Sequence, residues 1–355
     1  MEFLYEYGLF LAKAITIVAA LLVVLVVAMG AAMRNHKKSA EGDLIIENVN
    51  ETMEETEDLM LEHLLDKKAY KIHSKQKKHD SKDDKKNKDQ SRKKTSDTHE
   101  LIQSSSKNPR LFVIDFEGDV QVTEIDQLIN TIDAALLVAQ PGDEFLCTVE
   151  SPGGLVHAYG LAASQLKRIR DAGFKLTIAV DKVAASGGYM MACVADRIIA
   201  APFSIIGSIG VVAQIPNFNK ILQKNNVDIE LHTAGEYKRT LTMFGENTDE
   251  GRAKFQEELE ETHVLFKTFV FNNRPNLDIA QVATGEHWYG EQAINLGLID
   301  EISTSQSYLM KAVKDYSVFR LKFEKKVPLT EKLGFSLSRA LTRVLHSVGL
   351  GNPLK

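Results

Sequence analysis

The sequence has 355 residues, a formal net charge of -5, 44% hydrophobic residues and 26% charged residues. These values exclude a collagen-like, wholly disordered or many-spanning membrane chain, and two cysteines exclude a disulfide-stapled scaffold. The charge is unevenly distributed along the chain: residues 1–40 carry a net +2, residues 41–66 carry -10, residues 67–99 carry +8 and residues 100–355 carry -5. The first hundred residues are therefore expected to differ in kind from the rest.

An apolar run near the N-terminus predicts a membrane anchor. Residues 14–33 are 20 consecutive residues without a charge, and about 20 apolar residues suffice to cross a bilayer as a helix. We place one transmembrane helix at 9–33, after a short segment at 1–8. The alternative is a cleaved signal peptide, whose apolar core is normally shorter, at about 7–15 residues.

The basic residues around this run predict its orientation. Arg34, Lys37 and Lys38 follow the run, whereas only Lys13 borders its start. Because basic residues favour the cytoplasmic side, we expect a single-pass protein of the cell inner membrane, with the larger domain in the cytoplasm rather than the periplasm. Long domains can nevertheless be translocated regardless of this charge bias.

Two polar stretches follow the predicted anchor. Residues 34–66 are a juxtamembrane and acidic stretch in which apolar residues recur at loosely helical spacing. Residues 67–109 form a basic linker with too few apolar groups to fold, so we expect disorder there; a tether along anionic lipid headgroups is the alternative. The three histidines in this linker are irregularly spaced and do not indicate a metal site: His73, His79 and His99.

Strand and helix patterns alternate after Pro109 and predict an α/β domain with much parallel sheet over 110–318. The expected strands are 111–116, 144–150, 176–180, 197–201, 209–213 and 228–233. The expected helices are 123–139 with Thr123 as N-cap, 156–171, one from about 186, 217–226 and 249–273. Residues 319–355 form a tail with a basic amphipathic helix, which would pack on a neighbouring subunit or lie on a membrane.

Ser186 is a candidate nucleophile. It follows a strand and small residues, and Gly187 and Gly188 lead from it into a helix. A helix N-terminus favours a developing negative charge, and glycines leave backbone N–H groups accessible to an oxyanion. A second glycine turn, at 151–154, has N–H groups of the same kind. The alternative is an ordinary serine N-cap.

A serine nucleophile needs a base. His157, His232 and His263 lie in contexts that do not indicate a triad. Lys238 follows a strand, a glycine and a turn, and a desolvated lysine can act as general base in a Ser–Lys pair. An exposed surface lysine is the alternative for this residue taken alone.

Several motifs together resemble one family. They are Ala185–Tyr189, Gly207–Gly210 and Gly235–Lys238, followed by Gly285–Ala293 and Gly297–Asp300. In this order and at these separations they are similar to the signal peptide peptidase A (S49) family of serine proteases, most of all to its SohB branch. The resemblance covers about residues 110–315.

The resemblance implies a ClpP/crotonase-like superhelix of strand–strand–helix units. It also implies Ser186 as nucleophile and Lys238 as general base, with the N–H groups of Gly187 and Gly154 as oxyanion hole. Ser208 would orient the lysine amine. Subunits of similar proteins form rings or domes in which a neighbouring chain can complete a site.

The predicted function is that of a membrane-anchored serine endopeptidase, a hydrolase that cleaves membrane-associated peptides or signal-peptide remnants. We expect a homo-oligomer at a membrane, with peptide or protein substrates, no cofactor, no metal and no nucleic acid. One alternative is a crotonase-like acyl-CoA enzyme. Another is a non-enzymatic membrane scaffold that recruits partners through residues 41–99.

Overall fold

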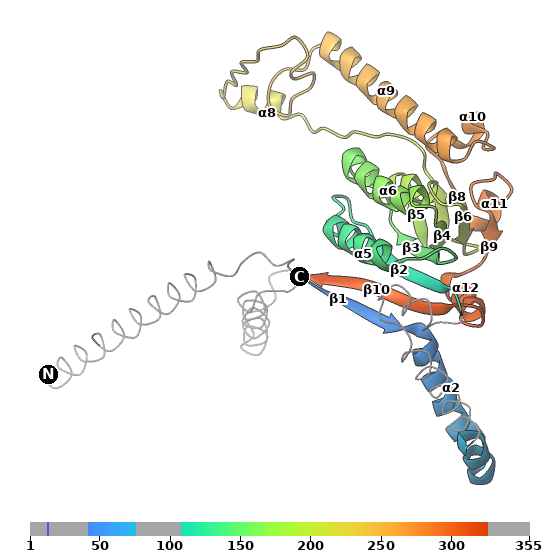
Figure 1. Cartoon of the computed structure of the whole chain (residues 1–355). Coiled ribbons are helices and arrows are strands. Elements are labelled where there is room, and N and C mark those ends of the chain that lie inside the picture. Colours follow the sequence, from blue (N-terminus) through green and yellow to red (C-terminus); the bar gives the residue numbers. More distant parts are fainter. Residues whose placement is uncertain (1–12, 14–41, 76–107, 326–355) are drawn as a thin grey trace, which may run out of the picture. The chain divides into compact units, whose positions relative to one another are not determined.

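A largely parallel sheet forms the centre of the structure, a computed structural model that describes residues 13, 42–75 and 108–325 (Figure 1). From β10 to β9, each neighbouring pair of strands is parallel. The strand order is β1 (Gly42–Asn48), β10 (Ser317–Lys325), β2 (Arg110–Glu117), β3 (Glu144–Glu150), β4 (Lys175–Val180), β6 (Arg197–Ala200) and β9 (Glu301–Ile302).

Three short strands form a second, smaller sheet. Its strands are β5 (Val183–Ala185), β7 (Ile205–Gly207) and β8 (His287–Tyr289), with β5 parallel and β8 antiparallel to β7. Ser151 directly follows β3 and forms an isolated bridge with Ala184 of β5. The chain leaving β3 therefore ties the large sheet to the small one.

Helices cover both faces of the main sheet. The core on one face is formed with α5 (Ile125–Val138), α6 (Val156–Asp171), α7 (Gly187–Ala192) and the second half of α9 (Asp249–Asn273). The other face packs against α12 (Ser305–Ala312) and the first turn of α2 (Val49–Leu64). Three shorter helices in the described residues are α8 (Asn219–Lys224), α10 (Ile279–Val282) and α11 (Gly290–Ala293).

Strand β2 shows why the sequence folds in this way. Phe112, Ile114 and Phe116 belong to one core, and Leu111 and Val113 belong to the core on the opposite face. Successive strand side chains point to opposite faces. A strand covered on both faces therefore reads as a continuous apolar run, as parallel strands do.

Several predicted elements are confirmed. β3 (Glu144–Glu150), α6 (Val156–Asp171) and α9 (Asp249–Asn273) have the predicted bounds. The predicted strands 176–180 and 197–201 differ from β4 and β6 by one residue at one end, and 111–116 differs from β2 by one residue at each end. The α/β architecture with a mostly parallel sheet is thus the one that the alternating pattern predicts.

The N-terminal segments differ from the prediction. Residues 43–48 belong to strand β1, and the helix begins only at Val49, where the Asn48 side chain accepts the Glu51 N–H. The prediction of disorder is wrong for 67–75, which are helical. At α5 the N-cap is Glu124 rather than Thr123, whose hydroxyl instead donates to the Asp119 carboxylate at 3.0 Å.

Two predicted strands, 209–213 and 228–233, have no regular structure. Ile209 is buried in the core, whereas Val212, Ala213 and all of 228–233 are exposed. A strand needs a paired neighbour for its backbone groups, and the described residues of this chain do not provide one there. The strand in this part of the chain is β7, which ends at Gly207, before the predicted strand 209–213 begins. At the other end, β10 crosses the predicted boundary at 318 and joins the main sheet.

Within 42–75 and 108–325, no helix is both long enough and sufficiently apolar to span a bilayer. The span predicted at 9–33 lies outside the described residues, apart from Lys13. The amphipathic helix predicted in the tail lies outside them as well, from residue 326 onward.

Candidate active site

Ser186 occupies the sharp connection between β5 and α7. Its backbone has φ 52° and ψ -115°, a positive φ that non-glycine residues rarely adopt. The Ser186 N–H donates to the Gly207 carbonyl at 2.7 Å and holds the connection against β7. Strained residues of this kind cost about 1–3 kcal/mol and persist where the surrounding structure fixes them, often at functional sites.

Helix α7 starts directly at this serine and is buried along its whole length. The Ser186 carbonyl accepts the Met190 N–H at 3.0 Å, which closes the first turn. The N–H of Gly187 is one of the first-turn donors that have no partner within the helix. The predicted oxyanion donor therefore lies at the positive end of a buried helix, next to the Ser186 side chain.

The glycine turn at 151–154 lies against Ser186. A Cβ on Gly153 would lie 2.7 Å from the Ser186 Cβ and 2.8 Å from the Gly187 nitrogen, and the φ of Gly153 is +92°. Both the close approach and the backbone conformation require glycine. Sequence reasoning singled out Gly154 in this turn and missed Gly153, because the two adjacent glycines cannot be told apart without the structure.

The two glycines have different surroundings. The Gly153 N–H donates to Ser151 Oγ at 3.1 Å. A Cβ on Gly154 would lie 2.2 Å from the Val120 carbonyl oxygen, and the described residues provide no acceptor for the Gly154 N–H. Of the two N–H groups, that of Gly154 is therefore the one left available to a ligand.

Ser208 follows β7 and also has a positive φ, of 51°. Its N–H donates to the Glu286 carbonyl at 2.7 Å, and its Oγ lies 3.5 Å from the Gly285 carbonyl. These contacts hold the serine against the segment that precedes β8. The described structure does not bring Ser208 to the amine of Lys238, which it was predicted to orient.

Lys238 is exposed and lies on an arm, which we define as residues 211–248 (Figure 1). The arm packs on the first turns of α9: the Tyr237 ring lies 5.3 Å from Lys254 Nζ, and a Cβ on Gly251 would lie 2.4 Å from the Thr240 carbonyl oxygen.

Helix α9 enters the core at the other end, through Phe266 and Val270. Lys254 and Phe266 are twelve residues apart on this helix, which corresponds to about 18 Å at 1.5 Å per residue. Within the described part of the chain, no hydrogen bond or ion pair joins Lys238 to Ser186. A single chain thus presents the predicted nucleophile without the predicted base.

The histidines do not replace the lysine. His157 is exposed on α6, and the exposed His232 lies 3.4 Å from a Glu230 oxygen. His263 Nε2 lies 3.2 Å from the Ile209 carbonyl oxygen. Among the described residues, none of the three is hydrogen-bonded to Ser186.

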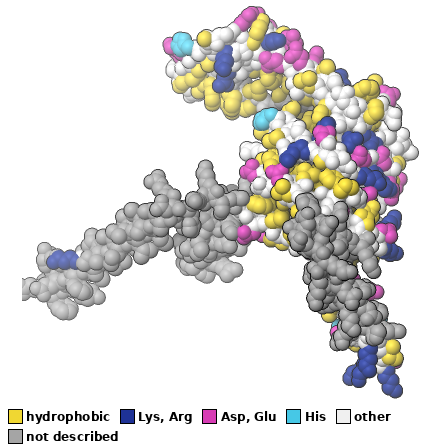
Figure 2. All heavy atoms as spheres, viewed as in Figure 1, with side chains coloured by type: hydrophobic (Ala, Val, Ile, Leu, Met, Phe, Trp, Pro, Cys, Tyr) yellow, Lys and Arg dark blue, Asp and Glu magenta, His cyan; other side chains and the backbone are white. Residues whose placement is uncertain are grey.

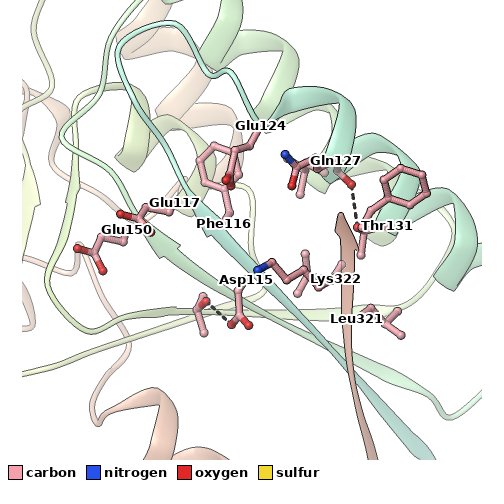
Figure 3. A pocket seen from close by; sticks show the side chains of 13 residues that line it. Asp115, Phe116, Glu117, Glu124, Gln127, Thr131, Glu150, Leu321 and Lys322 are labelled. Carbon is pink, nitrogen blue, oxygen red and sulfur yellow. Dashed lines mark hydrogen bonds between the residues drawn. The ribbon is translucent and has the colours of Figure 1, made fainter. Parts of the chain in front are cut away.

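A cavity of about 290 Å³ lies at the carboxyl ends of β2 and β3 (Figure 3). Asp115 in this cavity accepts a hydrogen bond from Thr148 Oγ at 2.7 Å. Glu150 lines the cavity and directly precedes Ser151, but Ser186 is not among the lining residues. The cavity therefore borders the glycine turn without including the candidate nucleophile.

Comparisons with known proteins identify the family. The family model described as "Peptidase family S49" matches residues 168–318, and the model described as "Peptidase family S49 N-terminal" matches residues 2–166. The probable protease SohB of Haemophilus influenzae is 46% identical over 345 residues, which are 97% of this chain and 96% of the relative. The probable protease SohB of Buchnera aphidicola from Schlechtendalia chinensis is 47% identical over 313 residues, 87% of this chain and 99% of the relative.

Solved structures are less similar. A membrane-bound stomatin-specific protease in complex with a substrate peptide aligns over 66% of this chain and 100% of its own, with 14% identity and a TM-score of 0.40. ClpP1 from Listeria monocytogenes aligns over 60% of this chain and 98% of its own, with 14% identity and a TM-score of 0.37. The sequence relatives, by contrast, extend over nearly the whole chain, and they favour the protease over the acyl-CoA enzyme and the scaffold. The chain therefore belongs to peptidase family S49, in its SohB branch, and is a serine protease.

Proposed function

We propose that this protease is an endopeptidase that cleaves with a Ser186–Lys238 dyad. The observation that carries the proposal is the geometry of Ser186, whose strained backbone sits at the start of the buried helix α7 with Gly153 packed against it. This arrangement places the hydroxyl of the half-buried Ser186 beside backbone N–H groups that have no acceptor among the described residues, as nucleophilic attack on a carbonyl requires.

The reaction would proceed as acyl transfer. Neutral Lys238 takes the proton from Ser186 Oγ while that oxygen attacks the peptide carbonyl, and the N–H groups of Gly187 and Gly154 bind the oxyanion. The intermediate collapses to an acyl-enzyme as the protonated lysine gives its proton to the leaving amine. Water, deprotonated by the same lysine, then attacks the acyl-enzyme, and the second product leaves as the lysine returns this proton to Ser186 Oγ.

Lys238 has to be removed from water for this role, because burial disfavours the charged form of a lysine. It is exposed in the single chain, so we infer that the arm of one copy places Lys238 beside Ser186 of another. Hydrophobic side chains gather on the arm (Figure 2), and large exposed apolar patches mark interaction surfaces. The exposed apolar residues of the arm include Val212, Ile215, Phe218, Ile221, Ile229, Leu231 and Phe244.

The test uses two variants alone and then together. Ser186→Ala and Lys238→Ala should each abolish casein cleavage, whereas Lys220→Ala, which removes another exposed lysine of the arm, should not. Co-expression of the two inactive variants should restore about a quarter of wild-type activity if each site takes one residue from each of two neighbours. Wild-type cleavage by either single variant would falsify the dyad, and no restoration on co-expression would refute its division between chains.

We further propose that the apolar run at 9–33 anchors the enzyme in the inner membrane and that its substrates are membrane-associated peptides or signal-peptide remnants. The basic residues after the run support a cytoplasmic protease domain. Adding an external protease to intact spheroplasts tests this: a domain inside is protected, and degradation before lysis would refute the orientation. Faster cleavage of a signal peptide than of an equally long polar peptide is the expected substrate preference, and the reverse order would refute it.

A further inference from the structure

A chain of three hydrogen bonds runs beneath the glycine turn. The Gly153 N–H donates to Ser151 Oγ at 3.1 Å, Ser151 Oγ is bonded to the Tyr159 hydroxyl, and this hydroxyl donates to the Asp119 carbonyl at 2.8 Å. A carbonyl can only accept and the tyrosine has one proton, so Ser151 must donate to Tyr159. All three bonds therefore point in the same direction, from the turn toward Asp119.

The two side chains at the middle of this series, Ser151 and Tyr159, are fully buried. Burial raises the pKa of Tyr159 above its ordinary value, so the hydroxyl keeps its proton at neutral pH and can donate it. Buried hydrogen bonds in series strengthen one another and hold their members in one arrangement. The position of the turn is thus fixed by a side chain of helix α6.

The ring of Tyr159 contacts the other side of the site. A Cβ on Gly187 would lie 2.3 Å from the ring carbon Cγ of Tyr159, so the ring packs directly against the Gly187 backbone. The Tyr159 side chain therefore contacts both segments that are predicted to supply oxyanion donors, the start of α7 and the glycine turn. Its ring supports the start of α7, and its hydroxyl holds the turn at 151–154.

We propose that Tyr159 is a positioning residue that sets the distance between the Gly187 backbone and the glycine turn, and thereby the width of the oxyanion hole. The proposal rests on the proposed function, since it takes these two segments as the oxyanion donors. It assigns Tyr159 no contact with the substrate. Loss of the hydroxyl should leave substrate binding nearly intact and weaken the transition state, because only the transition state carries the oxyanion.

The test compares two buried tyrosines. Tyr159→Phe keeps the ring and removes the hydroxyl. Tyr189→Phe is the matched control, since its hydroxyl is equally buried and donates to the Leu298 carbonyl at 2.9 Å, away from the turn. We expect kcat of Tyr159→Phe to fall about 10- to 100-fold with KM within about twofold, less than the loss of a whole oxyanion donor, and kcat of Tyr189→Phe to stay near wild type.

A second variant interrupts the same series of hydrogen bonds and tests the proposal if Tyr159→Phe fails to fold. Ser151→Ala removes the acceptor of the Gly153 N–H, and should lower kcat and the affinity for a peptide boronate, an oxyanion mimic, by similar factors. The double variant should lose no more than the worse single variant, because both act through one chain.

The outcomes separate the two proposals. Wild-type kcat and boronate affinity in Tyr159→Phe or in Ser151→Ala, with Ser186→Ala inactive, would overturn the positioning role and leave the dyad standing. Equal loss of kcat in Tyr159→Phe and Tyr189→Phe would also overturn it, since it would show a general effect of core polarity. Activity in Ser186→Ala would overturn both proposals together.

Discussion

Replacing Gly153 with alanine adds one methyl group at the closest approach between the glycine turn and the nucleophile. That group would lie 2.7 Å from the Ser186 Cβ and 2.8 Å from both the Ala185 carbonyl oxygen and the Gly187 nitrogen. Two of these three neighbours are backbone atoms and cannot rotate away. The segments on the two sides of the site must therefore separate by several tenths of an ångström.

The magnitude has two parts. A non-glycine residue at φ +92° costs about 1–2 kcal/mol, and an extra methyl group in a packed interior costs about 1–3 kcal/mol more. Gly153→Ala should thus destabilise the fold by about 2–5 kcal/mol. A misplacement of about 1 Å can lower kcat about 100-fold, so for this smaller shift we expect kcat to fall about 10- to 100-fold.

Gly142→Ala is the matched control. Its φ is +98°, but a Cβ there has no atom within 4 Å, so it shows only the backbone strain of about 1–2 kcal/mol. Urea unfolding gives the two stability losses, and casein cleavage with a fluorophosphonate probe gives kcat and the reactivity of Ser186. The reasoning is refuted if both variants lose equal stability and Gly153→Ala keeps wild-type kcat.

Three further predictions concern the rest of the fold. Burial alone would raise the pKa of Asp300, but hydrogen bonds from Arg274 and Ile198 lower it below its ordinary value. Because the Asp300 side chain is 36% exposed and water screens the pair, Asp300→Asn should cost only about 1 kcal/mol at pH 6, and a pH series of melts should show this difference vanish as acid protonates the wild-type carboxyl. Asn50→Ala should cost about 2–3 kcal/mol in urea unfolding, since Asn50 bonds three backbone groups near β10, the Val313 and Tyr316 carbonyls and the Val318 N–H. Burial raises the pKa of both thiols, Cys193 to about 12, so native protein should resist iodoacetamide that labels Cys147 and Cys193 after unfolding.

The sequence predicted those elements whose side chains pack within one chain. Helix α6 and strand β3 have the predicted bounds because burial on one face or on both faces leaves a periodic apolar pattern. The strand predicted at 228–233 has the same kind of pattern, but its side chains are exposed and none of the strands within 42–75 and 108–325 pairs with it. The periodicity of apolar residues indicates which side chains are suited to burial, but it does not indicate which part of the protein packs against them.

The candidate site shows the same division. The sequence placed Ser186 at a helix N-terminus, and the structure confirms this position. It could not distinguish Gly153 from Gly154, because their difference arises from the packing of Val120 and Ser186 against the turn. The position of Lys238 at the far end of a long helix depends on contacts that no local spacing encodes.

The position of Lys238 on the arm implies that the activity of the enzyme depends on association between its copies. Under the proposed assembly, a single chain carries the half-buried Ser186 and a lysine that does not contact it, so it is inactive until it pairs with another copy. Specific activity should then rise with enzyme concentration before it levels off, as pairing saturates. Dilution would then keep the protease inactive until its copies associate.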